Sequence, residues 1–190
     1  MKLTLLRHGI TEGNQKNLCY GMTDLPLLPE GIAALREAAQ TKSYPKAEHY
    51  YTSGMLRTEQ TLEMLYGQVP HEVLPGLREI DCGKLEMQPF DALEELPEFR
   101  NWMHDATGDT PVPGGESFRQ VLERGLEELY KLIEKDEDAV CVMHGGIIGL
   151  ILDHWFPGKP FGYYVPHPGE GYQVTVTAGK PVELQAVPEA

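Results

Sequence analysis

The chain has 190 residues, which is the length of one domain rather than of several. Hydrophobic residues make up 41% and charged residues 24%, a globular composition that argues against disorder. The formal net charge of −13 argues against nucleic acid or an anionic membrane as a partner, although a locally positive pocket can still hold a small anion. We therefore expect a single domain over residues 1–190.

The sequence shows neither a targeting segment nor a cysteine framework. The apolar run at the N-terminus is too short for a signal peptide, and the longest mostly apolar stretch, residues 139–152, contains His144. Cys19, Cys82 and Cys141 form no C-x-x-C pair, so neither disulfides nor a structural zinc site are expected. A reducing cytoplasm is the expected location.

Strands and helices are expected to alternate along the chain. The clearest helix covers Ser117–Lys135, where apolar residues recur at the i, i+3, i+4 spacing behind an N-cap at Ser117. This alternation predicts an α/β fold, a three-layer α/β/α sandwich with a mostly parallel central sheet. In chain order, we expect a strand over 2–6, helices over 30–40 and 55–66 on either side of a strand over 49–52, the helix 117–135, a buried strand over 139–143, a helix over 146–155, and strands over 172–177 and 182–187.

Residues 88–112 interrupt the alternation. They contain three prolines, an acidic cluster and Trp102. We expect them to cross one edge of the sheet as a lid, or as a packed surface segment. Trp102 is expected to pack within this segment, with stacking on a substrate ring as the less favoured alternative.

Two predicted strands end in histidine. Arg7 and His8 follow the strand 2–6, and His144 follows the strand 139–143 and precedes two glycines that open a helix. Ligands of open α/β sheets bind outside the carboxyl ends of strands, and free N–H groups at a helix N-terminus bind anions. Two such strand ends in one small domain indicate an anion site.

Arg57 and a pair of carboxylates extend this pattern. Arg57 falls in the first turn of a predicted helix, where a cation is unfavourable unless an anion lies nearby. Glu79 and Asp81 lie in an extended stretch before a glycine turn. Either of them could act as a general acid, and solvated loop carboxylates are the alternative.

These motifs together resemble the histidine phosphatase superfamily, also called phosphoglycerate-mutase-like. The opening Leu6-Arg7-His8-Gly9-x-Thr11-x-x-Asn14 is similar to the family's signature. The resemblance runs from Lys2 to about Leu152. Further matching stretches are Ser53…Arg57-x-x-Gln60-Thr61, Leu77-Arg78-Glu79-x-x-x-Gly83…Glu86, Pro113-x-Gly115-Glu116-Ser117…Arg124 and His144-Gly145-Gly146.

The resemblance implies a role for each site residue. His8 would be the nucleophile that accepts a phosphoryl group, oriented by a hydrogen bond to a carbonyl near Gly9, and Glu79 would donate a proton to the leaving group. His144 would stay protonated among the phosphate oxygens. The catalytic set would be His8, Glu79, His144, Arg7 and Arg57, and the phosphate-binding set Arg7, Asn14, Arg57, His144 and Gly145.

The resemblance leaves the activity open. We expect a metal-independent phosphomonoesterase without a cofactor, whose partner is a small phosphorylated metabolite. The size and the Leu-Arg-Glu-Ile-Asp-x-Gly stretch look like small α-ribazole phosphatase-like members, although sugar-phosphate phosphatases share these motifs. One alternative is a cofactor-dependent phosphoglycerate mutase, which needs a basic lid, whereas Arg100 is the only Lys or Arg in residues 88–112. The other is a non-catalytic phosphate-ligand binding module.

Some features stay undecided. The histidines show no H-x-x-x-H pairing, so no metal site is expected. Substrate specificity should lie in residues 88–112 and near His167, in a late loop that could face the site. The sequence does not indicate the oligomeric state.

Overall fold

The computed structural model describes residues 1–189. A central six-stranded sheet has the order β4-β3-β6-β1-β7-β8. The four strands from β4 to β1 pair in parallel, whereas β7 and β8 are antiparallel, which confirms the mostly parallel sheet. The strands are β1 (Lys2–Arg7), β3 (His49–Thr52), β4 (Glu72–Val73), β6 (Ala139–Met143), β7 (Gly171–Thr177) and β8 (Lys180–Val187), of which the short β4 was not predicted.

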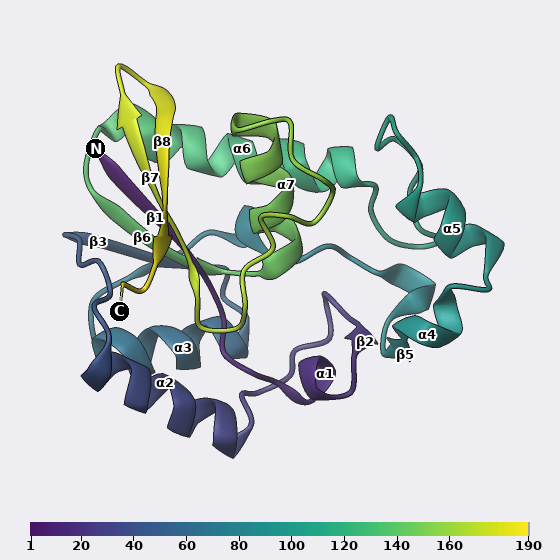
Figure 1. The fold of residues 1–190 in the computed structure, drawn as a ribbon, viewed down its shortest axis with the longest axis horizontal. Helices are drawn as coiled ribbons and strands as arrows, with labels where there is room; N and C mark the ends of the chain where they lie inside the picture. The colour runs from purple at the N-terminus through teal and green to yellow at the C-terminus, as the bar shows by residue number, and fades with distance from the viewer. Residues whose placement is uncertain (190) are drawn as a thin grey trace.

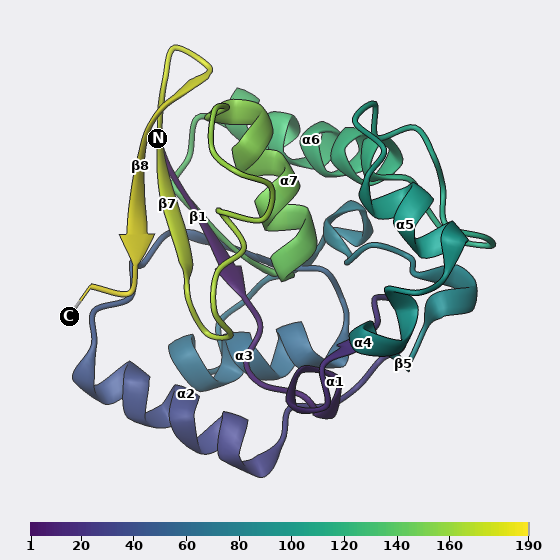
Figure 2. The same cartoon turned by 45° about the vertical axis from the view of Figure 1, so that its right-hand side comes forward.

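Helices cover both faces of the sheet (Figures 1 and 2). Helices α2 (Pro29–Thr41) and α3 (Leu56–Tyr66) pack together on one face, and α6 (Phe118–Lys135) and α7 (Gly145–Trp155) on the other. The predicted three-layer sandwich is therefore confirmed. Because both faces are covered, every residue of β6 is buried.

Two helix starts follow the sequence closely. Ser117 caps α6, and its hydroxyl accepts from the backbone N–H of Gln120 while the Gln120 side chain accepts from the backbone N–H of Ser117. Helix α2 instead begins with Pro29 in its first turn, and Leu28 provides no side-chain cap. Within residues 1–189, no helix combines the length and apolar character needed to span a membrane.

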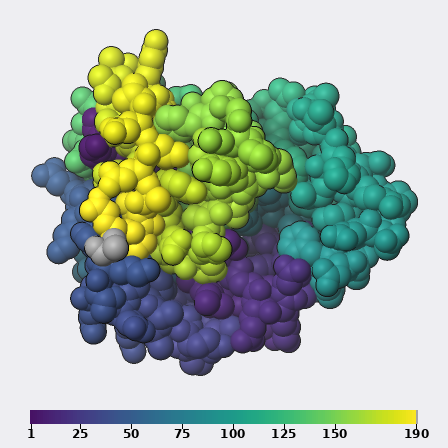
Figure 3. All heavy atoms as spheres, in the orientation of Figure 1, coloured from purple at the N-terminus to yellow at the C-terminus, as the bar shows by residue number. Residues whose placement is uncertain are grey.

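Residues 88–112 form a lobe beside the sandwich. In the space-filling view this teal lobe lies on the opposite side of the molecule from the yellow C-terminal strands (Figure 3). Trp102 is 3% exposed and contacts Phe99 within the lobe at 6.1 Å between ring centroids, as predicted. It also stacks on Phe118, outside the lobe, at 5.0 Å. The lobe contains the short strand β5 (Gln88–Pro89) and helices α4 (Phe90–Leu93) and α5 (Pro97–Met103). Strand β5 pairs with β2 (Leu18–Cys19), which follows the short α-helix α1 (Glu12–Gln15).

Candidate active site

The carboxyl ends of β1 and β6 meet at one edge of the sheet. Arg7 pairs with Met143 in the parallel register, so His8 and His144 leave the sheet side by side. The two imidazole rings lie 5.2 Å apart between centroids, edge to face. The structure therefore brings together the two strand-end histidines that the sequence singled out.

His8 is 3% exposed and is oriented by its own turn. Its Nδ1 lies 2.7 Å from the Gly9 carbonyl oxygen, as predicted. Because a carbonyl only accepts, Nδ1 carries the hydrogen and Nε2 of the neutral ring keeps a lone pair. Burial, with the charges of Arg57 and Arg7, holds the pKa of His8 well below its usual value. A neutral imidazole with an available Nε2 is the form that attacks phosphorus.

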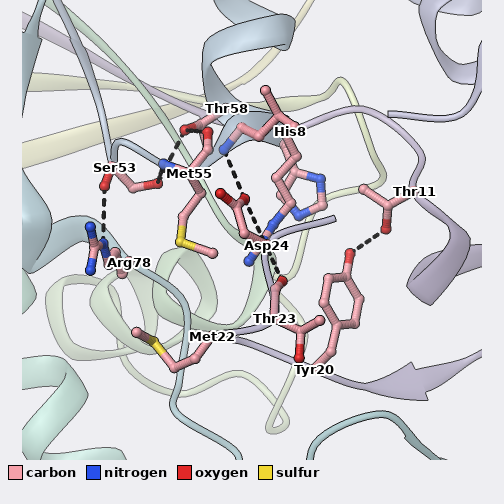
Figure 4. Close-up of polar contacts among 12 residues, drawn as sticks. His8, Thr11, Tyr20, Met22, Thr23, Asp24, Ser53, Met55, Thr58 and Arg78 are labelled. Carbon is pink, nitrogen blue, oxygen red and sulfur yellow. Dashed lines mark hydrogen bonds and ion pairs between the residues drawn. The ribbon is translucent and has the colours of Figure 1, made fainter. Parts of the chain in front are cut away.

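His144 is fully buried, and both of its ring nitrogens have protein partners. Arg57 Nε donates to Nδ1 at 3.2 Å, which places the hydrogen on Nε2, 2.8 Å from Ser53 Oγ. Ser53 then donates to Thr58, whose hydroxyl donates to the Met55 carbonyl (Figure 4). Burial and Arg57 hold the pKa of His144 well below its usual value. The structure therefore differs from the predicted phosphate contact: both ring nitrogens of His144 face protein groups, and the ring orients Arg57.

Arg57 lies fully buried in a cage of acceptors. Its Nη1 donates to the Thr23 carbonyl at 3.0 Å and its Nη2 to the Gly21 carbonyl at 2.7 Å, while its Cζ lies 5.1 Å from the centroid of the Tyr20 ring. With the bond to His144, three of five N–H groups are used, which leaves two for a ligand. Burial lowers the pKa of Arg57, and an anion would offset that cost.

Arg7 has a donor that the protein does not satisfy. Its Nη1 donates to the Pro166 carbonyl at 2.8 Å, but its buried Nε has no acceptor within residues 1–189. Burial also lowers the pKa of Arg7. A Cβ on Gly145 would lie 3.0 Å from both Cζ and Nε of Arg7, so this glycine provides room for the guanidinium. Gly145 does not line the cavity itself, which differs from the predicted phosphate contact.

Glu79 occupies the N-terminus of α7. Its Oε2 accepts from the Gly146 N–H at 2.8 Å, and its Oε1 accepts from the N–H groups of Ile147 and Ile80 at 3.1 and 3.0 Å. The N–H groups of Gly146 and Ile147 at this helix end are therefore occupied by the protein's own Glu79 carboxyl group. A Cβ on Gly146 would lie 2.7 Å from Glu79 Oε1, so only glycine leaves room for this contact.

Arg124 and Glu116 hold the segment that carries Glu79. Arg124 donates to the carbonyls of Gly76, Arg78 and Glu79 at 2.7–2.9 Å and forms two 2.8 Å bonds with the Glu116 carboxylate. Sequence reasoning assigned no role to this pair. Their presence in the matching motif was the only signal, because contacts between α6 and a distant loop follow from the fold.

Glu86 organises the loop that holds Arg57. Its Oε1 accepts from the N–H groups of Gly21 and Met22 at 2.8 and 2.9 Å, and its Oε2 accepts from the Thr23 hydroxyl at 2.6 Å. The carbonyls of Gly21 and Thr23 are therefore turned toward Arg57. This role was also not predicted from the sequence.

Asn14 lines the cavity, as predicted. Its Oδ1 accepts from the Thr11 N–H at 3.0 Å and from the Tyr20 hydroxyl at 3.2 Å, and Tyr20 also bonds the Thr11 hydroxyl at 2.5 Å (Figure 4). With its oxygen engaged, the Asn14 amide nitrogen remains as a donor for a ligand.

The other predicted candidates lie outside the cavity wall. Asp81 Oδ1 accepts from the Gly83 N–H at 2.8 Å and shapes a turn, so Glu79 is the carboxylate that faces the cavity. His167 is exposed and does not line the cavity, although the neighbouring Pro168 does.

The cavity has a volume of about 480 Å³ and two chemically different ends. The polar end is lined by Arg7, His8, Asn14, Arg57 and Glu79. The other end is walled by apolar side chains from the lobe, from the start of α6, from α7 and from the loop that follows α7. This apolar wall consists of Phe90, Trp102, Met103, Phe118, Leu150, Phe161 and Val165.

Curated relatives carry mutase names. A protein of Serratia proteamaculans named "Probable phosphoglycerate mutase GpmB" is 32% identical over 80% of this chain and 73% of its own length. The 2,3-bisphosphoglycerate-dependent phosphoglycerate mutase of Bradyrhizobium diazoefficiens is 31% identical over 79% of this chain and 78% of its own length.

Solved structures share the fold over nearly the whole chain. The phosphoglycerate mutase of Thermus thermophilus has a TM-score of 0.77 at 30% identity, covering 98% of this chain and 99% of that one. An Escherichia coli K-12 protein provisionally described as an alpha-ribazole-5′-P phosphatase has a TM-score of 0.86, covering 100% and 96%, but at 20% identity this likeness shows the fold alone. The family model for branch 1 of the histidine phosphatase superfamily matches residues 3–182, and with the paired strand-end histidines this places the chain in that superfamily.

Proposed function

We propose that the protein is a phosphomonoesterase that transfers a phosphoryl group to His8 and then to water. The observation that carries this proposal is the neutral, buried His8, whose Nε2 is available beside two guanidiniums with unused N–H groups. Arg7 and Arg57 would bind the equatorial phosphate oxygens, and Asn14 would add a neutral donor. The two arginines supply the positive charge, so the proposal needs no metal ion.

In the first step, the P–Nε2 bond to His8 forms as the P–O bond to the leaving group breaks. A protonated Glu79 gives its proton to the departing oxygen, and the α7 amides then stabilise the resulting carboxylate. In the second step, this carboxylate takes a proton from water, whose oxygen attacks phosphorus and releases His8. Glu79 regains its proton and phosphate leaves.

The charges of the cavity favour hydrolysis over a mutase reaction. Among the lining residues that the structure describes, Arg7 and Arg57 are the only Lys or Arg, and both lie at the phosphate end. A phosphoglycerate carries a carboxylate, and a bisphosphoglycerate a second phosphate as well, so each needs further cations. The mutase names of the relatives keep that reaction as the second candidate.

The test is release of phosphate from a panel of monoesters with a chelator present, together with trapping of labelled phosphoenzyme under alkaline quench. We expect acid-labile label on His8, and His8→Ala should lower turnover by about 10⁴-fold or more. His154→Ala, an exposed histidine at the end of α7, is the matched control.

Three results would change the conclusion. Label on another residue, or substantial turnover by His8→Ala, would exclude His8 as the nucleophile. Activity lost to the chelator and restored by metal would exclude the metal-free mechanism. Isomerisation of 3-phosphoglycerate after priming, without net hydrolysis, would make the protein a mutase.

A further inference from the structure

We infer that the leaving group of the substrate is an uncharged alcohol that carries an apolar ring, rather than a sugar, a glycerate or a second phosphate. This inference rests on the proposed phosphomonoesterase activity and specifies its substrate class. The juxtaposition that supports it is a two-arginine phosphate end joined to a wall of aromatic rings with a carboxylate at its far end.

The rings of the apolar wall touch one another in sequence. Trp102 stacks on Phe118 at 5.0 Å between centroids, and Phe118 meets Phe161 at 5.5 Å. Phe99, which is buried and does not line the cavity, contacts both Trp102 and Phe90 at 6.1 Å between centroids. Rings in contact at these spacings leave no room between them, but together they form a continuous aromatic surface. A further ring packs against such a surface more favourably than a hydrated polyol, whose hydroxyls would lose water without gaining partners.

Phe161 leaves apolar surface exposed at this end of the cavity. Its side chain is 64% exposed even though its ring contacts Phe118. Val165, four residues further along the same loop, is 41% exposed and also lines the cavity. A bound ring would cover this apolar area, which provides a driving force that a polar leaving group does not offer.

Charge at the far end opposes a second anionic group. Gly146, Gly149, Leu150 and Asp153 share one face of α7 and line the cavity. At 1.5 Å per residue, Asp153 lies roughly 10 Å along the helix from the Gly146 amide that holds Glu79. Among the cavity-lining residues that the structure describes, the only charged side chain beyond the phosphate end is therefore the Asp153 carboxylate, which repels a glycerate carboxyl or a second phosphate.

The first experiment compares monoesters of aliphatic alcohols with similar acidity, so that intrinsic leaving-group reactivity does not decide the result. We expect kcat/KM for 2-phenylethyl phosphate to exceed that for propyl phosphate and glycerol 3-phosphate by about 10- to 100-fold. Phe161→Ala should lower the ratio of phenylethyl to propyl ester about 3- to 10-fold. Tyr163→Ala is the matched control, because Tyr163 is 56% exposed in the same loop but does not line the cavity.

The second experiment tests the charge. Asp153→Lys should raise kcat/KM for 3-phosphoglycerate relative to propyl phosphate about tenfold, since it converts repulsion into attraction. Glu37→Lys makes the same change in net charge on the exposed surface of α2 and should leave the ratio unchanged. An equal response to both variants would mean that overall charge, not Asp153, sets the preference.

The outcomes separate this inference from the proposed function. Hydrolysis of all esters at similar kcat/KM, or a preference for the polyol or the glycerate, would overturn the inference and leave the phosphatase intact. No phosphate release from any ester and no phosphohistidine would overturn the proposed function itself.

Discussion

The two ends of the cavity are built in opposite ways. At the phosphate end, side chains project from the ends of β1 and β6 and from the first turn of α3, and buried hydrogen bonds fix them. At the leaving-group end, apolar side chains come from a lobe beside the sheet and from the loop after α7, and Phe161 stays largely exposed. If the proposed function holds, the sheet fixes the groups that act on phosphate, whereas peripheral segments set the choice of leaving group.

The largest loss of activity is expected from a change at Glu79, which belongs to the polar end of the cavity. Glu79→Gln removes the transferable proton, and the amide can offer only one oxygen to the three N–H groups that Glu79 now satisfies. We expect the first turnover of an alkyl phosphate to slow by about 10²- to 10⁴-fold.

The control for Glu79→Gln is an ester whose leaving group needs no proton. The burst of 4-nitrophenolate from 4-nitrophenyl phosphate should slow far less than release of 2-phenylethanol, when both are measured in a single turnover. Equal losses for the two esters would mean that Glu79 only maintains the structure of the α7 N-terminus.

A smaller effect is expected from Arg124, which acts through Glu79. Arg124→Ala removes the bonds to three carbonyls of residues 76–79, so the acid should move and kcat for the alkyl ester should fall by about 10- to 100-fold. The loss should again be smaller for 4-nitrophenyl phosphate, which distinguishes a positioning role from general destabilisation. Arg119→Ala is the matched control, because Arg119 lies on the same helix but is exposed and pairs with Asp109. Equal losses of activity in the two variants would mean that the contacts of Arg124 do not position Glu79.

The juxtaposition at the phosphate end could be predicted from the sequence because it follows from regular, buried strands. Strand periodicity places Arg7, His8 and His144 at the ends of buried strands, and parallel pairing brings such ends together. Even the bond from His8 to Gly9 follows from one turn of backbone. The hydrogen-bond roles of His144 could not be predicted, because they depend on which nitrogen meets Arg57 and Ser53.

The leaving-group end could not be predicted because neither strand nor helix periodicity places its side chains against one another. Trp102 and Phe118 belong to different segments, and no periodicity indicates that they stack or that Phe161 joins them. The contacts of the amides at the start of α7 could not be predicted either, because the position of Glu79 against Gly146 and Ile147 follows from the fold.

The smallest predicted effect is on stability, and it concerns the phosphate end alone. Within residues 1–189, the buried histidines are His8 and His144, and both lie at that end. Folding depresses the pKa values of His8 and His144 below 6.5, so below pH 6.5 the unfolded chain binds more protons than the folded one. The free energy of unfolding should therefore have its full value above pH 6.5. It should decrease as the pH falls below 6.5, by up to about 1.4 kcal/mol per pH unit for each histidine. Urea denaturation between pH 7.5 and 5.5 should show this slope, and His144→Gln should reduce it by about half, whereas the exposed His154→Gln should not. An unchanged slope in His144→Gln would mean that His144 is not held neutral, and Arg57 Nε would then have lost the acceptor that the structure gives it.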